Sequence, residues 1–206
     1  MLQETFIRLL GHYPGHQALA GAYWEEIMTQ YTAPQRHYHN LHHLRQLLEQ
    51  LLQIRTAVRD WNAMLFTLYY HDIVYDPRQQ DNEAQSALIA SERLERLGVP
   101  AAVIQRCTGQ IAATATHTLS ADSDTNYFTD ADLSILGQGR EVYEQYYRAV
   151  RLEYDCYPDD IYILGRKKVL EHFLSMSRIF KTGYFHSRLE VQARDNIAGE
   201  LEYLQG

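Results

Sequence analysis

The chain has 206 residues, 46% of them hydrophobic, which suits a globular protein that buries a substantial core. The net charge is −7 and no run of Lys or Arg occurs, which excludes general binding of a nucleic-acid polymer. Binding of a small phosphorylated metabolite is still compatible with this charge. The chain has two cysteines, which lack metal-finger spacing, and it shows neither an export signal nor an apolar run of membrane-spanning length. These features predict a soluble, cytoplasmic protein without a membrane partner.

Helical periodicity organises the whole chain. Short helices are expected at residues 2–10 and 127–137, and further helices at about 16–31, 41–54, 56–72, 81–97, 100–117, 140–156, 160–181 and 187–204. Asp81 is expected to cap the start of one helix and Gly98 its end. No strand-like alternation, repeat or linker is seen. We therefore predict an all-α bundle of roughly eight or nine helices, forming a single domain over residues 1–206. Its oligomeric state is left open, with a homodimer as one arrangement.

The pair His71-Asp72 sets an imidazole and a carboxylate side by side at the end of an apolar run. Both groups are good ligands for divalent metals of intermediate hardness, but two ligands alone hold a metal poorly. Further ligands must therefore come from other helices. The candidates are His39 or His43 upstream, His117 downstream, and Asp130 or Asp132 beyond it.

The order of these residues resembles the HD superfamily of metal-dependent phosphohydrolases. The resemblance covers about residues 38–137 and rests on Tyr-His-Asn-x-x-His, His-Asp-Ile-x-Tyr and Asp-Ala-Asp-Leu, which look like one uncharacterised bacterial branch of that family. It implies an HD-type fold with a motif core at about 36–137 and C-terminal helices 140–204 packing over it. The metal ligands that it implies are His39, His71, Asp72 and Asp132.

Two ligand positions keep an alternative. His43, one helical turn after His39, competes with it, and the residue that is not a ligand is expected to form hydrogen bonds near the ligand histidine or with the substrate. Asp130 competes with Asp132, unless it caps the short helix. Because only His117 lies between the His-Asp pair and the final Asp, the resemblance implies one divalent ion, which could be Mn, Co, Ni, Mg, Zn or Fe.

The chemistry implied is hydrolysis of a small phosphate ester, with a nucleotide as the expected substrate. A divalent ion lowers the pKa of a bound water and polarises a phosphoryl oxygen. Asp72 or Asp132 would orient the water, Glu83 is the candidate acid/base, and His117 is either a supporting or substrate-contacting residue or an ordinary helix-end histidine. The groups expected at the substrate are Arg36, His43, Arg78, Arg151 and Arg166.

Some of these residues, and the function as a whole, also have other interpretations. Glu83 could be a helix N-terminal acid favoured by the dipole, and Arg151 and Arg166 could be surface or ion-paired groups. A di-iron oxygenase with the same fold is an alternative function, although this chain has few histidines for two metals. A ligand-binding or regulatory module without turnover is another.

Overall fold

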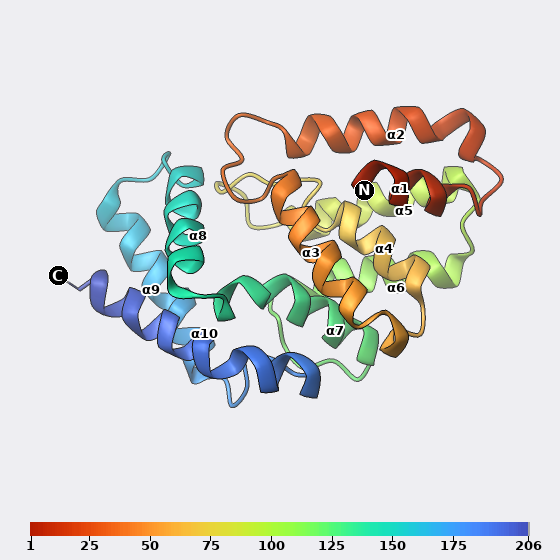
Figure 1. Cartoon of the computed structure of the whole chain (residues 1–206). Coiled ribbons are helices and arrows are strands. Elements are labelled where there is room, and N and C mark those ends of the chain that lie inside the picture. The colour runs from red at the N-terminus through yellow and green to blue at the C-terminus, as the bar shows by residue number, and fades with distance from the viewer. Residues whose placement is uncertain (206) are drawn as a thin grey trace. The chain divides into compact units, whose positions relative to one another are not determined.

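A computed structural model describes residues 1–205 of the chain (Figure 1). That part holds ten α-helices and two 3₁₀ turns and has no strand, so the all-α prediction is confirmed with one or two helices more than expected. The helices are α1 (Leu2–Leu10), α2 (His16–Tyr31), α3 (Leu41–Gln53), α4 (Trp61–Tyr70), α5 (Asn82–Leu97), α6 (Ala101–Ala113), α7 (Ser123–Asp132), α8 (Arg140–Glu153), α9 (Asp159–Ser175) and α10 (Gly183–Tyr203). Within residues 1–205, no helix is both long and apolar enough to cross a membrane.

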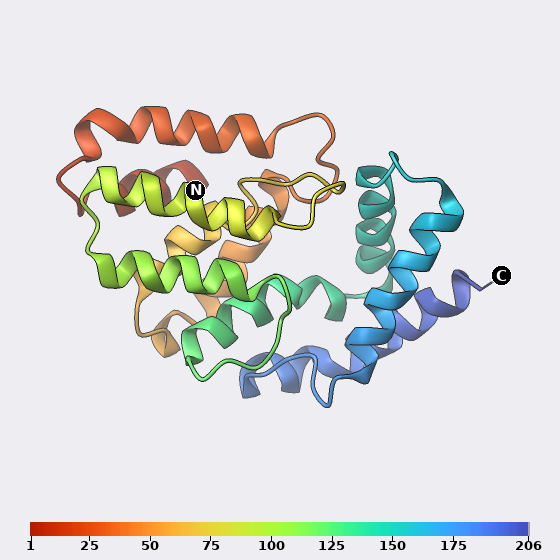
Figure 2. The same ribbon diagram turned by 180° about the vertical axis from the view of Figure 1, so that it is seen from behind.

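The chain divides into two compact units. The first runs from Met1 to Thr129 and contains α1 to α6 with most of α7, drawn in red to green in Figure 2. The second begins at Asp130 and contains the end of α7, a 3₁₀ turn at Leu133–Gly137, and α8 to α10. A single domain over the whole chain stays a prediction.

Helix α4 is the central element of the first unit. Every residue from Ala63 to Tyr70 is buried, so this helix is apolar all round and packs on several neighbours at once. It contacts α1, α3, α5 and α6 (Figures 1 and 2). Its C-terminal end, where His71 follows, is therefore held inside the unit.

The start of α4 is fixed by two aspartates. Asp60 is the N-cap, and its Oδ1 accepts a hydrogen bond from the Ala63 amide at 3.0 Å. The buried carboxylate of Asp124 accepts from the Arg59 amide at 3.0 and 3.1 Å and from the Asp60 amide at 2.8 Å. Thr56, the expected start, instead lies in a 3₁₀ turn, because these caps begin the helix at Trp61.

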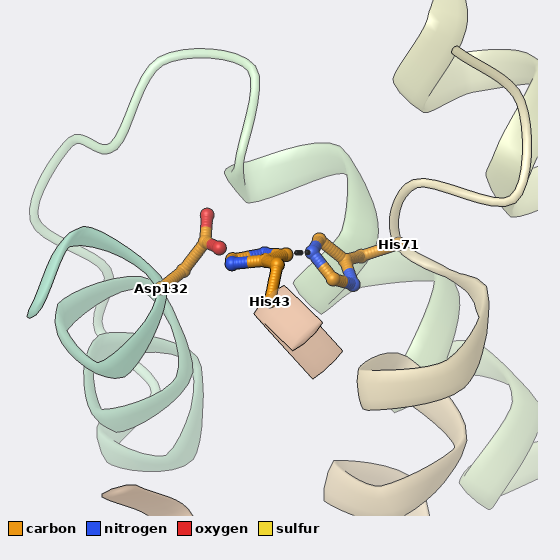
Figure 3. A group of neighbouring side chains, drawn as sticks. All are labelled: His43, His71 and Asp132. Carbon is orange, nitrogen blue, oxygen red and sulfur yellow. Dashed lines mark hydrogen bonds between the residues drawn. The ribbon is translucent and has the colours of Figure 1, made fainter. Parts of the chain in front are cut away.

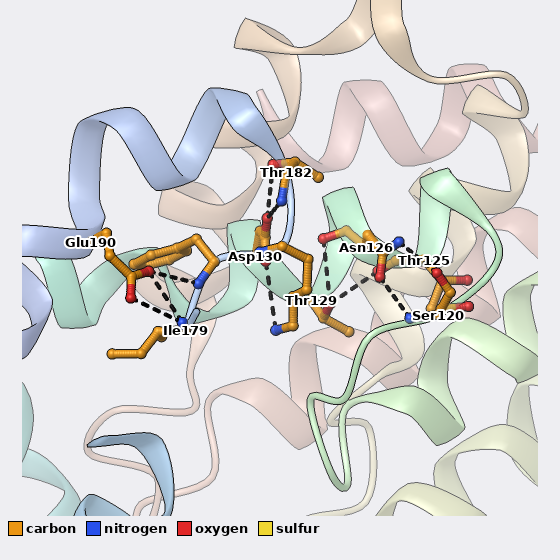
Figure 4. A network of polar contacts seen from close by, with 10 residues as sticks. Ser120, Thr125, Asn126, Thr129, Asp130, Ile179, Thr182 and Glu190 are labelled. Atoms are coloured by element: carbon orange, nitrogen blue, oxygen red, sulfur yellow. Dashed lines mark hydrogen bonds and ion pairs between the residues drawn. The ribbon is translucent and has the colours of Figure 1, made fainter. Parts of the chain in front are cut away.

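In the second unit, two acids set the connection from α9 to α10 (Figure 4). Glu190 accepts hydrogen bonds from the amides of Ile179 and Phe180, and Asp130 accepts from the amides of Lys181 and Thr182. These amides no longer need helical partners. Consequently α9 ends at Ser175 rather than near residue 181, and α10 begins at Gly183 rather than near residue 187.

The predicted caps have different outcomes. Gly98 ends α5 in the left-handed conformation, with φ of 77°, as predicted. Asp81 occupies the N-cap position, but its side chain accepts from the Gln85 side-chain amide instead of a helix amide. Asp130 does not cap the helix that carries it, since its carboxylate is used by Lys181 and Thr182.

Candidate metal centre

His71 is the most buried member of the candidate centre and occupies the C-cap of α4. Its amide donates to the Thr67 carbonyl oxygen at 2.9 Å, which continues the helical pattern up to the histidine. Its Nδ1 lies 3.0 Å from the Leu68 carbonyl oxygen. A carbonyl oxygen only accepts, so Nδ1 carries a proton and Nε2 is the ring nitrogen that faces the other candidate ligands.

Two other candidate ligands converge on this Nε2 atom. The Asp72 Oδ2 atom lies 3.1 Å away, and the Nε2 atom of His43, a buried residue of α3, lies 3.3 Å away. Two buried imidazoles and a largely buried carboxylate are thus brought together. Such a set is expensive to bury unless its members share a proton or an ion.

Asp132 joins the group through helix α7. The ring of Phe128 makes an edge contact with the ring of His71, with centroids 5.5 Å apart, and Asp132 lies one turn further along the same helix face. One ligand atom from each of His43, His71 and Asp132 lies within 4.8 Å of the others. Figure 3 shows His43 between Asp132 and His71.

The donor set of this group suits a divalent metal. Two neutral imidazoles and one carboxylate are ligands that zinc, manganese, cobalt, nickel and iron accept. Ligand atoms bind such ions at roughly 2.0–2.2 Å, so two atoms on one ion are at most about 4.4 Å apart. A group whose ligand atoms lie within 4.8 Å of one another reaches that spacing with small side-chain movements. His43, His71 and Asp132 could therefore hold a metal ion.

Comparison with known proteins adds no family. No family model, no curated protein and no solved structure matches this chain.

Arg36 fixes the backbone beside the centre. Its NH1 donates to the carbonyl oxygen of Asp72 at 2.6 Å and to that of His39 at 3.1 Å, and its NH2 donates to that of Ile73 at 3.0 Å. The side chain is buried, and its guanidinium lies 4.8 Å from the ring centroid of Tyr31. These contacts position the backbone of Asp72, and the substrate-binding role expected for Arg36 stays a prediction.

The second fixed point of Asp72 is its amide, which donates to the hydroxyl of Tyr31 at 3.2 Å. Both backbone polar groups of Asp72 are thus held by side chains. Neither the Tyr31 contact nor the Arg36 contacts with Asp72 and Ile73 could be found from sequence, because these partners are more than 30 positions apart.

His39, the preferred upstream ligand, lies beside the group. Its ring stacks on the ring of Tyr75, with centroids 4.2 Å apart and planes 29° apart, and its centroid is 5.9 Å from that of His43. The convergent group contains His43, the competitor that sequence analysis also placed near the substrate. A ligand role for His39 stays a prediction.

The remaining candidates of the first unit lie on loops and helix ends. Glu83 is half-buried in the first turn of α5, a position that the helix dipole favours for an acid. His117 has φ of 50°, and its amide donates to the Ala113 carbonyl oxygen in the turn after α6. Arg78 is exposed and holds Asp76 in a hydrogen-bonded ion pair, which lowers the pKa of the Asp76 carboxyl. Their catalytic and substrate roles stay predictions.

The two candidate arginines of the second unit, Arg151 and Arg166, form ion pairs there. Arg166 is buried and donates to both carboxylate oxygens of Glu200, at 2.7 and 2.9 Å. Arg151 donates to Asp159 at 2.6 Å and to the carbonyl oxygens of Tyr154 and Tyr157. The ion-paired alternative considered for these residues is thus observed, and a phosphate-binding role stays a prediction.

Proposed function

We propose that the protein is a metal-dependent phosphohydrolase of the HD superfamily, acting on a small phosphate ester with a nucleotide as the expected substrate. The observation that carries the proposal is the convergence of His43, His71 and Asp132 on one point, with Asp72 next to it. The residue order from His39 to Asp132 supplies the link to phosphoester hydrolysis. A cytoplasmic location, expected from the cysteine usage, belongs to the same proposal.

His43, His71 and Asp132 would hold one divalent ion, with Asp72 as the adjacent carboxylate. When bound, such an ion supplies Lewis acidity for attack of water on phosphorus. The Asp72 carboxylate, 3.1 Å from the His71 Nε2 atom, would bind the ion or accept a proton from the attacking water. Arg36 fixes the backbone of this residue by donating to the Asp72 carbonyl oxygen.

Phosphate release from a panel of nucleotides and sugar phosphates tests the proposal. The assay is run with added Mn, Co, Ni or Mg on the wild-type chain, on Asp72→Ala and on a control, Arg45→Met. Arg45 is exposed on the helix that carries His43. We expect release that needs metal, disappears in Asp72→Ala and persists in the control.

Three outcomes, read from phosphate release, from metal and oxygen measurements and from ligand binding, would overturn the proposal. Silence across the panel with metal demonstrably bound would remove hydrolysis. Bound iron together with oxygen consumption would favour the oxygenase alternative, and tight binding of a phosphate ester without turnover would favour a binding module.

A further inference from the structure

A cavity of about 250 Å³ lies in the second unit, between α8 and α10, whose ribbons are drawn in Figures 1 and 2. Its inner part is lined by the buried residues Tyr143, Asn196 and Glu200, and its outer part by more exposed side chains. None of these residues belongs to the candidate metal centre.

The inner wall is preformed because its polar groups already have partners. The Tyr143 hydroxyl donates to Glu200 at 2.5 Å, and the charge of Glu200 is balanced by Arg166. The Asn196 side-chain amide donates to the carbonyl oxygens of Leu136 and Gln138 at 2.8 and 2.7 Å. A cavity with such a wall stays open without a conformational change, as small-molecule sites commonly do.

Three tyrosine rings line this one cavity. The ring centroid of Tyr147 lies 5.8 Å from that of Tyr143 and 6.0 Å from that of Tyr203, which comes from the other helix. Tyr203 is 69% exposed, so its ring is little used in packing. Aromatic faces around an open space favour a planar ring that stacks on them.

The rim carries opposite charges in equal number. Arg140 and Arg148 both donate to Glu144, at 3.2 Å each, and Asp195 supplies a second carboxylate. The charges of the two arginines and the two acids sum to zero, so the net electrostatic field of the rim favours binding of neither an anion nor a cation. The same groups offer both donors and acceptors to the edge of a bound ring.

We propose that this cavity binds a neutral heteroaromatic ring whose edge carries hydrogen-bond donors and acceptors, the chemical class of the nucleobases. The ring stacks on Tyr147 or Tyr203, and its edge bonds to the guanidinium groups and to Asp195. The proposal does not depend on the metal centre or on hydrolysis.

Calorimetric titration of the full chain with adenosine and uridine tests it, with benzoate and tetramethylammonium as charged comparison probes. Gly199→Leu fills the cavity, since Gly199 lines it and an added Cβ meets no atom within 4 Å. Gly165→Leu is the matched control, because Gly165 is also a helical glycine with open space but lies outside the cavity. Circular dichroism checks that each variant folds.

We expect at least one nucleoside to bind, with affinity reduced tenfold or more in Gly199→Leu and in Tyr147→Ala and unchanged in Gly165→Leu. His71→Ala should retain nucleoside binding, which separates this site from the metal centre. The proposal is overturned if neither nucleoside binds at millimolar concentration, if Gly199→Leu binds as well as wild type, or if a charged probe binds more tightly than both nucleosides.

Discussion

The guanidinium of Arg36 and the carbonyl oxygen of Asp72 lie 2.6 Å apart, although 36 positions separate the two residues in sequence. This hydrogen bond ties the segment before α3 to the residue that follows His71. The segment before α3 leads to His43, and the end of α4 carries His71. Arg36 thus joins the two backbones from which the imidazoles of the candidate centre project.

Replacing Arg36 by Met is expected to weaken metal binding about 10- to 100-fold, the usual effect of losing a group that supports metal ligands. Arg36→Lys should recover only part of the affinity, because one ammonium group cannot reach three carbonyl oxygens in the plane that guanidinium uses. Isothermal titration with Mn or Co measures the affinity, with Arg45→Met as control. Equal affinities in wild type and Arg36→Met would show that the hydrogen bonds serve folding alone.

The upstream ligand can be identified by comparing three histidine variants. His43→Ala should lose most of the metal affinity, since the His43 Nε2 atom lies 3.3 Å from that of His71. His39→Ala should lose less, because His39 stacks on Tyr75, and His42→Ala should lose nothing, because His42 is exposed. A larger loss in His39→Ala than in His43→Ala would restore His39 as the ligand.

Glu190 gives the fold a defined sensitivity to acid. Burial alone would raise the pKa of its carboxyl, but the amides of Phe180 and Ile179 and the guanidinium of Arg194 hold that pKa below the ordinary value of 4.5. The carboxylate therefore contributes stability that is fully present above pH 4.5 and is lost as the pH falls through the lowered value.

Glu190→Gln should lower the free energy of unfolding at pH 7 by about 1–3 kcal/mol, because buried amides lose a charged acceptor. Its stability should also depend less on pH below 4.5 than that of wild type. Urea unfolding at several pH values measures both effects, and Glu171→Gln, an exposed site on α9, is the control. If the stability of Glu190→Gln fell below pH 4.5 as steeply as that of wild type, the role given to the Glu190 carboxylate would be contradicted.

The two thiols should react at very different rates. Cys107 is fully buried on α6, and burial raises the pKa of its thiol to about 12, whereas Cys156 is exposed. The thiolate is the reactive form, so an alkylating reagent at pH 8 should label Cys156 alone in the native protein. Mass spectrometry of the labelled chain counts the modified thiols. Rapid labelling of both without denaturant would contradict the buried position of Cys107.

Local sequence patterns predicted a helix end well where a residue at that end itself stops the helix. Gly98 is such a signal, since glycine adopts the left-handed conformation readily. The boundaries of α4, α9 and α10 were misplaced because they depend on Asp124, Asp130 and Glu190, which bind backbone amides 64, 52 and 10 positions away. Short motifs carry no information about such partners.

Ligand chemistry and residue order were enough to predict part of the candidate site. His71, Asp72 and Asp132 stand out because imidazole and carboxylate side chains occur there in otherwise apolar company. The choice between His39 and His43 depends on which of two neighbouring residues at the start of α3 faces α4, and the structural role of Arg36 depends on its tertiary contacts. Both are decided by packing between helices.

The most direct test of the metal centre is the metal content of the chain after equilibrium dialysis against Mn, Co, Ni or Zn. Elemental analysis should find one ion per wild-type chain and a strongly reduced content in His71→Ala and Asp132→Asn, each checked for folding by circular dichroism. The control His42→Ala should bind as wild type does. Wild-type protein without stoichiometric metal, or variants that retain the full content, would contradict the account.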